Sequence, residues 1–195
     1  MAYSDGSIPN ALKEADLIKE LFPGTAVSWI GQSAVKDSLI KHMREFDILH
    51  FAVHGVPSSV DPSLFALQLA PGKSDDGRLF IHDVFGLDLT RRNPIVILSA
   101  CETGVGQEYQ SGISPGGEVA SLHRAFLFAG ARTVVSTLWK VDDRGSLVFM
   151  DLFYRALQRE QNSVIALQQA QQAMRAQPEF RHPFYWAAYI VTGMR

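Results

Sequence analysis

Residues 94–104 read PIVILSACETG, and residues 47–55 read DILHFAVHG. Both stretches are apolar runs of strand length, which is typical of strands buried on both faces of a parallel sheet. Ligands bind at the carboxyl ends of the strands in such sheets, so we expect His54 and Cys101 at the functional edge. Cys101 is the only cysteine of the chain. A lone cysteine and a histidine placed in this way predict a thiolate nucleophile with its acid/base partner.

The composition of the 195-residue chain favours one globular α/β domain. Hydrophobic residues make up 47% and charged residues 19%, which argues against disorder. The net charge of −2 argues against a nucleic-acid partner. A single cysteine excludes an internal disulfide and fits a reducing compartment. The sequence shows neither a signal peptide nor an apolar run long enough to span a membrane. We therefore expect a cytoplasmic protein with no membrane partner.

The rest of the sequence alternates between helical and strand patterns. It predicts helices over residues 10–22, 33–46, 118–128, 144–159 and 163–176, and further strands over residues 26–30, 132–139 and 185–191. Two apolar runs, 64–69 and 78–81, flank a polar loop and predict a β-hairpin. Strands that alternate with helices form a three-layer α/β/α sandwich around a mostly parallel sheet.

Each candidate catalytic residue also has a structural interpretation. An arbitrary lone cysteine is more often a small buried core residue, and a histidine can simply end a strand. Three features favour catalysis here: both residues lie at strand ends, Gly104 allows a sharp turn after Cys101, and Gly55 follows His54 directly. The Gly55 N–H can point at an oxyanion. His50 shares a face with His54 but lies deeper, so we interpret it as structural.

Other reaction classes fit the sequence poorly. Residues 112–116 read GISPG, which matches the nucleophile-elbow pattern of serine hydrolases. That elbow needs a strand before the serine and a backbone N–H after it, whereas a polar loop precedes Ser114 and Pro115 has no N–H. The glycines of this loop form no phosphate-binding fingerprint, and no HExxH or CxxC motif is present. We therefore expect no cofactor and no metal.

The two strand-end motifs, His54-Gly55 and ACETG at residues 100–104, resemble those of the CHAT domain. This is a caspase-like cysteine peptidase family related to caspases and separase. Further segments match in order: PNALKEA at 9–15, AFLFAGAR at 125–132, STLWKVDD at 136–143 and PFYWAAY at 183–189. His54 and Cys101 lie 47 positions apart, close to the caspase spacing of roughly 50. The resemblance covers residues 8–193, so residues 9–195 are interpreted as the peptidase domain and residues 1–8 as a leader or tail.

The resemblance implies a caspase-like sandwich with one departure at its start. Family members usually have a strand before the first helix, but residues 1–8 form a poor strand pattern. Two alternatives stay open: the sheet lacks its first strand, or the chain is a fragment of a longer protein. Because family members commonly carry tetratricopeptide repeats upstream, the resemblance also implies a regulatory upstream module or a partner protein.

The resemblance further implies cleavage of a protein or peptide substrate by a Cys-His dyad. Cys101 attacks the peptide carbonyl, His54 handles the proton, and the backbone N–H groups of Gly55 and Cys101 hold the oxyanion. Residues 104–117 are expected to be mobile and to shape the entrance. In relatives, the segment after the next strand lines the substrate groove; here it contains Trp139, Asp142 and Asp143.

The carboxylates of Asp142 and Asp143 predict a Lys or Arg at the cleaved position. Asp142 is equally well placed to cap the helix that begins near Arg144, which would leave the pocket neutral.

Two other function classes compete with the peptidase. One is a catalytically inactive CHAT-fold scaffold or interaction module. The other is a cysteine-dependent amidase or transferase that acts on small molecules, which a closed apolar pocket would favour over an open groove.

Overall fold

The computed structural model describes residues 1–3, 10–56, 58, 64–99, 117–139 and 141–193. The helices are α1 (Asn10–Leu21), α2 (Lys36–His42), α3 (Ile81–Phe85), α4 (Gly117–Phe128), α5 (Asp143–Glu160) and α6 (Ser163–Ala176). The strands are β1 (Ile48–Ala52), β2 (Gly55–Val56), β3 (Ala66–Gln68), β4 (Arg78–Phe80), β5 (Ile95–Ser99), β6 (Thr133–Thr137) and β7 (Tyr189–Gly193). Within these ranges, no helix is both long and apolar enough to cross a bilayer.

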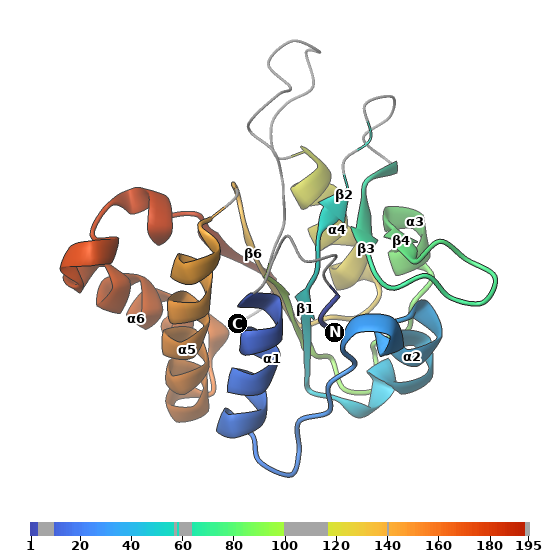
Figure 1. Ribbon diagram of the computed structural model, residues 1–195, viewed down its shortest axis with the longest axis horizontal. Coiled ribbons are helices and arrows are strands. Elements are labelled where there is room, and N and C mark those ends of the chain that lie inside the picture. The colour runs from blue at the N-terminus through green and yellow to red at the C-terminus, as the bar shows by residue number, and fades with distance from the viewer. Residues whose placement is uncertain (4–9, 57, 59–63, 100–116, 140, 194–195) are drawn as a thin grey trace.

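The main sheet contains four strands in the order β1-β5-β6-β7. β1, β5 and β6 run parallel, and β7 pairs antiparallel with β6. A small antiparallel sheet of β2, β3 and β4 lies beside it (Figure 1). The predicted mostly parallel sheet with an added hairpin is therefore confirmed, and β3 and β4 are the two strands of that hairpin.

Strand β5 shows why this sheet is covered on both faces. All five of its residues are buried, as the unbroken apolar run predicts. Ile95 and Ile97 pack in one apolar cluster with α5 and α6, whereas Val96 and Leu98 pack in a second cluster with α4. Figure 1 shows α1, α5 and α6 on one side of the sheet and α2, α3 and α4 on the other. The alternation along one strand thus gives the predicted three-layer sandwich.

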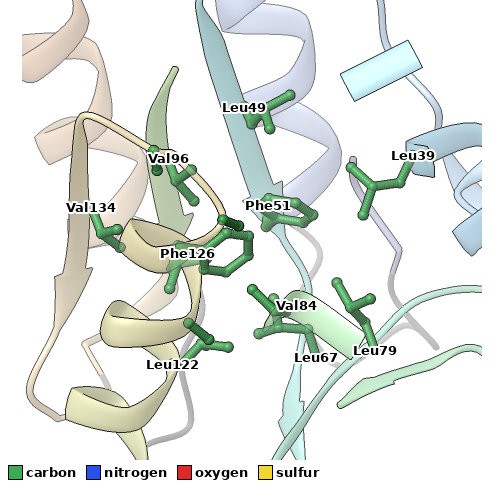
Figure 2. Packing of buried hydrophobic residues seen from close by; sticks show 14 of the residues in the cluster. Leu39, Leu49, Phe51, Leu67, Leu79, Val84, Val96, Leu122, Phe126 and Val134 are labelled. Atoms are coloured by element: carbon green, nitrogen blue, oxygen red, sulfur yellow. The ribbon is translucent and has the colours of Figure 1, made fainter. Parts of the chain in front are cut away.

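The second cluster is centred on two aromatic rings. Phe51 of β1 and Phe126 of α4 are fully buried, with ring centroids 5.7 Å apart. Figure 2 shows them between Val96 and Val134 of the main sheet and the leucines of the hairpin. Contact between these rings holds α4 against β1, the strand that leads to His54.

We predict that Phe126→Ala lowers the free energy of unfolding by about 3–5 kcal/mol, because it leaves a cavity in a closed core. The matched control is Phe128→Ala, which lies in the same helix but is 75% exposed in the wild type. This control should cost less than about 1 kcal/mol. Urea denaturation of both variants provides the comparison, and equal losses would contradict the described packing.

A buried histidine connects α4 to the two strands at the far edge of the sheet. His123 Nε2 lies 2.6 Å from Ser136 Oγ of β6, and Nδ1 lies 3.0 Å from Thr192 Oγ1 of β7. Burial lowers the pKa of His123 from 6.5 to about 4. The unfolded chain therefore takes up a proton on this histidine at higher pH than the folded chain does.

It follows that His123 makes the fold less stable as the pH falls from 6.5 to about 4. The loss attributable to this group is at most about 3 kcal/mol. We predict that His123→Gln, which retains hydrogen-bonding capacity, flattens the pH dependence of the unfolding free energy over this range. His82→Gln is the control, because the His82 side chain is 68% exposed. The prediction fails if the two variants have the same pH dependence.

The outer edge of β1 is only partly paired. Ala2 forms isolated parallel bridges to Ala52 and to Ile30. The predicted strand over residues 26–30 is wrong, since Ile30 contributes only this bridge. Beyond the bridge, a pocket of about 470 Å³ separates residues 25–29 from β1, and it is lined by apolar side chains that include Ile18 and Phe22 of α1. Within the described ranges, residues 26–29 therefore have no neighbouring strand with which to form a ladder.

Candidate active site

Strands β1 and β5 end at the same edge of the main sheet. They are parallel neighbours, and their register pairs Ala52 with Ser99. Ala52 lies two residues before His54, and Ser99 lies two residues before Cys101. Since paired residues of neighbouring strands lie at the same level, the register brings the ends of both predicted motif strands together at the carboxyl edge of the sheet.

His54 lies at the junction of the two sheets, between the end of β1 and the start of β2. Its side chain is half-buried, and its carbonyl oxygen accepts a hydrogen bond of 2.8 Å from the Gln68 backbone N–H. Gly55 is the buried first residue of β2 and pairs with Leu67 of β3. The backbone of His54 is thus held by the main sheet on one side and by the small sheet on the other.

Cys101 lies outside the described residues, as do Ser114 and residues 104–116 of the loop predicted to be mobile. The last residue of that predicted loop, Gly117, is the first residue of α4. The approach of Cys101 to His54 and the mobility of the loop therefore stay predictions.

The three predicted substrate-binding residues follow the end of β6, the other neighbour of β5. Trp139 is half-buried, and its Nε1 donates to the carbonyl of Phe184 at 3.0 Å. Asp142 is exposed and caps α5, accepting from the Gly145 N–H at 3.2 Å. The capping interpretation is thus realised in the structure. Asp143 accepts from the Asn10 N–H at 3.0 Å, and partial burial raises the pKa of its carboxyl despite this bond.

A buried carboxylate lies beneath this edge. Glu14 of α1 is only 3% exposed. Its Oε2 lies 3.1 Å from Nε2 of His50 on β1, and its Oε1 accepts a hydrogen bond of 2.9 Å from the Ser146 hydroxyl of α5. Ser146 Oγ also lies 3.2 Å from Ser99 Oγ at the end of β5. One carboxylate thereby connects two helices and the two strands that lead to the predicted dyad.

The second ring nitrogen of His50 also has a hydrogen-bonding partner. Its Nδ1 lies 2.8 Å from the hydroxyl of Tyr154 on α5. Burial, and then the nearby Glu14 carboxylate, raise the pKa of Tyr154 well above its ordinary value. The tyrosine therefore keeps its proton and can donate it to His50 Nδ1, while Nε2 lies within hydrogen-bond distance of Glu14. His50 lies deeper than His54 and is fully engaged in the fold, which fits its structural interpretation.

Comparison with known families agrees with these motifs and this topology. The sequence matches the CHAT domain family over residues 2–194, nearly the whole chain. The chain belongs to the CHAT domain family. Family membership associates it with the caspase-like peptidases, whose α/β sandwich the described sheets and helices resemble.

Two curated proteins are similar to this chain over nearly its whole length. The chain is 27% identical to tetratricopeptide repeat protein 28 of Homo sapiens over 219 residues, and 27% identical to the protein of the same name from Mus musculus over 224 residues. Each alignment covers 96% of this chain, but only 8% of the human protein and 9% of the mouse protein. The chain therefore spans less than a tenth of the length of the curated relatives that it matches.

Sequence reasoning missed Glu14, although a signal for it was present. In the first helix of this CHAT domain, Glu14 follows Ala11 by three residues and precedes Ile18 by four. This spacing places a carboxylate on the apolar face, where a buried partner is required. The partners themselves, His50 and Ser146, lie 36 and 132 positions away in the sequence and could not be identified from it.

Proposed function

We propose that this CHAT domain is a caspase-like cysteine endopeptidase that uses Cys101 as nucleophile and His54 as its acid/base partner. The observation that carries the proposal is the pairing of Ala52 with Ser99. This register supports delivery of both residues to the same edge, each two residues beyond a pair of register partners. The hydrogen bond from the Gln68 N–H to the His54 carbonyl limits the freedom of the His54 backbone, which suits a group that must face one neighbour.

The chemistry proceeds in two steps. The Cys101 thiolate attacks the carbonyl carbon of the scissile bond, and the backbone N–H groups of Gly55 and Cys101 stabilise the resulting oxyanion. His54 gives a proton to the departing amine, which leaves a thioester on Cys101. Water then hydrolyses the thioester, with His54 accepting a proton from the water, and the thiol and the carboxylic acid product are released.

We also propose that a module in the same polypeptide or in a separate one regulates the activity of this domain. Both curated relatives are named as tetratricopeptide repeat proteins, and the chain spans less than a tenth of their length. A repeat module is therefore a suitable regulatory partner for this domain, in the same polypeptide or in a separate one. The inactive scaffold is the second candidate function, favoured by the incompletely paired edge of β1.

We predict that wild-type protein cleaves members of a fluorogenic peptide library and reacts with a peptidyl chloromethyl ketone faster than a free thiol does. Cys101→Ser should abolish both reactions, because its hydroxyl ionises far less readily than a thiol. His54→Ala should slow cleavage by about 10²–10⁴-fold. His82→Ala, which changes an exposed histidine, is the control.

Labelling distinguishes the peptidase from the scaffold. A scaffold has no reason to activate Cys101, so its thiol would react at the rate of a free cysteine in the wild type and in His54→Ala alike. Because an upstream module is a proposed activator, the assay includes the longer natural polypeptide where one exists. Absence of cleavage together with unactivated labelling in both forms would contradict the peptidase proposal.

We further propose that Trp139 forms an apolar wall of the substrate groove and that Asp142 and Asp143 favour a Lys or Arg at the cleaved position. The position of all three after β6, next to β5, supports this placement. Asp142 is exposed while it caps α5, so its second oxygen is not committed to the Gly145 N–H.

We predict that Asp142→Ser reduces the preference for basic peptides while leaving stability nearly unchanged, because serine caps a helix about as well as aspartate does. Asp142→Ala removes the charge and the cap together, so it should also lower the unfolding free energy by about 1 kcal/mol. Library profiling of these variants and of Asp143→Asn separates the two roles. A wild type that prefers acidic peptides, or variants that retain a basic preference in full, would refute the assignment.

A further inference from the structure

The buried Glu14 carboxylate is connected to the proposed active site by a short chain of contacts. Ser146 donates to Glu14 at 2.9 Å and lies 3.2 Å from Ser99, the last residue of β5. Ser99 is followed by Ala100 and then by Cys101 in the sequence. Only two side-chain contacts and two peptide units therefore separate Glu14 from the proposed nucleophile.

The same contacts reach the proposed substrate-binding residues. Ser146 lies in the first turn of α5, three residues after Asp143, and its backbone N–H donates to the Asp142 carbonyl at 2.9 Å. A second bond between α1 and this turn runs from the Asn10 N–H to the Asp143 carboxylate, at 3.0 Å. Helix α1 thus holds the start of α5 at two points, and Ser146 transmits its position to the end of β5.

Stability alone is a poor explanation for this arrangement. Removing a carboxylate from water costs several kcal/mol, and replacing a buried polar or ionic group by apolar side chains of the same volume is often neutral or stabilising. A hydrogen-bonded carboxylate differs from an apolar contact in that it fixes distances and directions. The elements fixed here, β1, β5 and the first turn of α5, are those that carry the proposed dyad and the proposed groove.

We propose that Glu14 is a positioning residue for the reaction at Cys101, acting through Ser146 and Ser99 to fix the end of β5 relative to α5 and β1. The inference rests on the proposed peptidase function. A nucleophile displaced by about 1 Å can lose about 10²-fold in rate, so a small shift at Ser99 has a measurable effect. A misplaced thiol also loses its interaction with the His54 imidazole, and its pKa then moves toward the free-cysteine value of about 8.5.

The test measures the rate of Cys101 alkylation by iodoacetamide against pH in the wild type, Glu14→Gln and Ser146→Ala. Positioning predicts that the midpoint of this profile moves upward by about one pH unit in both variants, which is about tenfold less thiolate below the midpoint. A purely electrostatic role for Glu14 predicts the opposite direction, because removal of a negative charge favours the thiolate. Ser146→Ala changes no charge, and alanine has a high helix propensity, so this variant should fold. Its profile therefore tests the positioning role even if Glu14→Gln fails to fold.

Ser163→Ala is the matched control. Like Ser146, Ser163 is a helix serine whose hydroxyl lies near that of a strand residue, here Thr133 Oγ1 at 3.3 Å. Ser163 is buried, and it contacts the amino end of β6, away from the proposed active site. Its alkylation profile should equal that of the wild type. Folded Glu14→Gln and Ser146→Ala proteins with the wild-type midpoint, or a shift of the same size in Ser163→Ala, would overturn the positioning role while leaving the peptidase intact. A wild-type midpoint equal to that of a free thiol would overturn both.

Discussion

The parallel pairing of β1 with β5 sets both the layers of the fold and the edge at which the proposed active site lies. It fixes Ala52 opposite Ser99 and buries β5 on both faces. Burial on both faces requires a helical layer on each side, which α5 and α6 supply on one side and α4 on the other. The register also decides which residues leave the sheet together. Because the side-chain period of a strand is two, a slip by one residue would turn His54 or Cys101 to the other face.

Buried polar contacts orient the helices relative to the strands that lead to the proposed active site. The apolar clusters define the layers, yet they contain few groups that fix the orientation of one element against another. Glu14 fixes the relative orientation of α1, β1 and α5 through its hydrogen bonds, and His123 does the same for α4, β6 and β7. Burial lowers the pKa of His123, and the two Glu14 oxygens each lie within hydrogen-bond distance of a partner, His50 Nε2 and Ser146 Oγ. Glu14 and His123 each connect elements that are distant in the sequence.

Much of the fold could be predicted because the decisive signals are local. Continuous apolar runs identified β1 and β5, and helical spacing located α1, α5 and α6 to within a residue or two. The strand expected at residues 26–30 failed because a strand exists only through its neighbour, and Ala2 forms just one bridge to this segment, at Ile30. The buried role of Glu14 depends on Ser146, 132 positions away, and no local pattern reports such a partner. Capping by Asp142 was foreseeable because its acceptor and donor are three residues apart.

The most direct measurement is a crystal structure of the protein after covalent reaction with a peptidyl chloromethyl ketone. We expect the inhibitor to be attached to Cys101 Sγ, with a His54 ring nitrogen within about 3–5 Å and the ketone-derived oxygen facing the N–H groups of Gly55 and Cys101. The peptide should lie beside the segment that contains Trp139 and Asp142. A structure in which His54 and Cys101 are too far apart to interact even through one water molecule would rule out the proposed dyad.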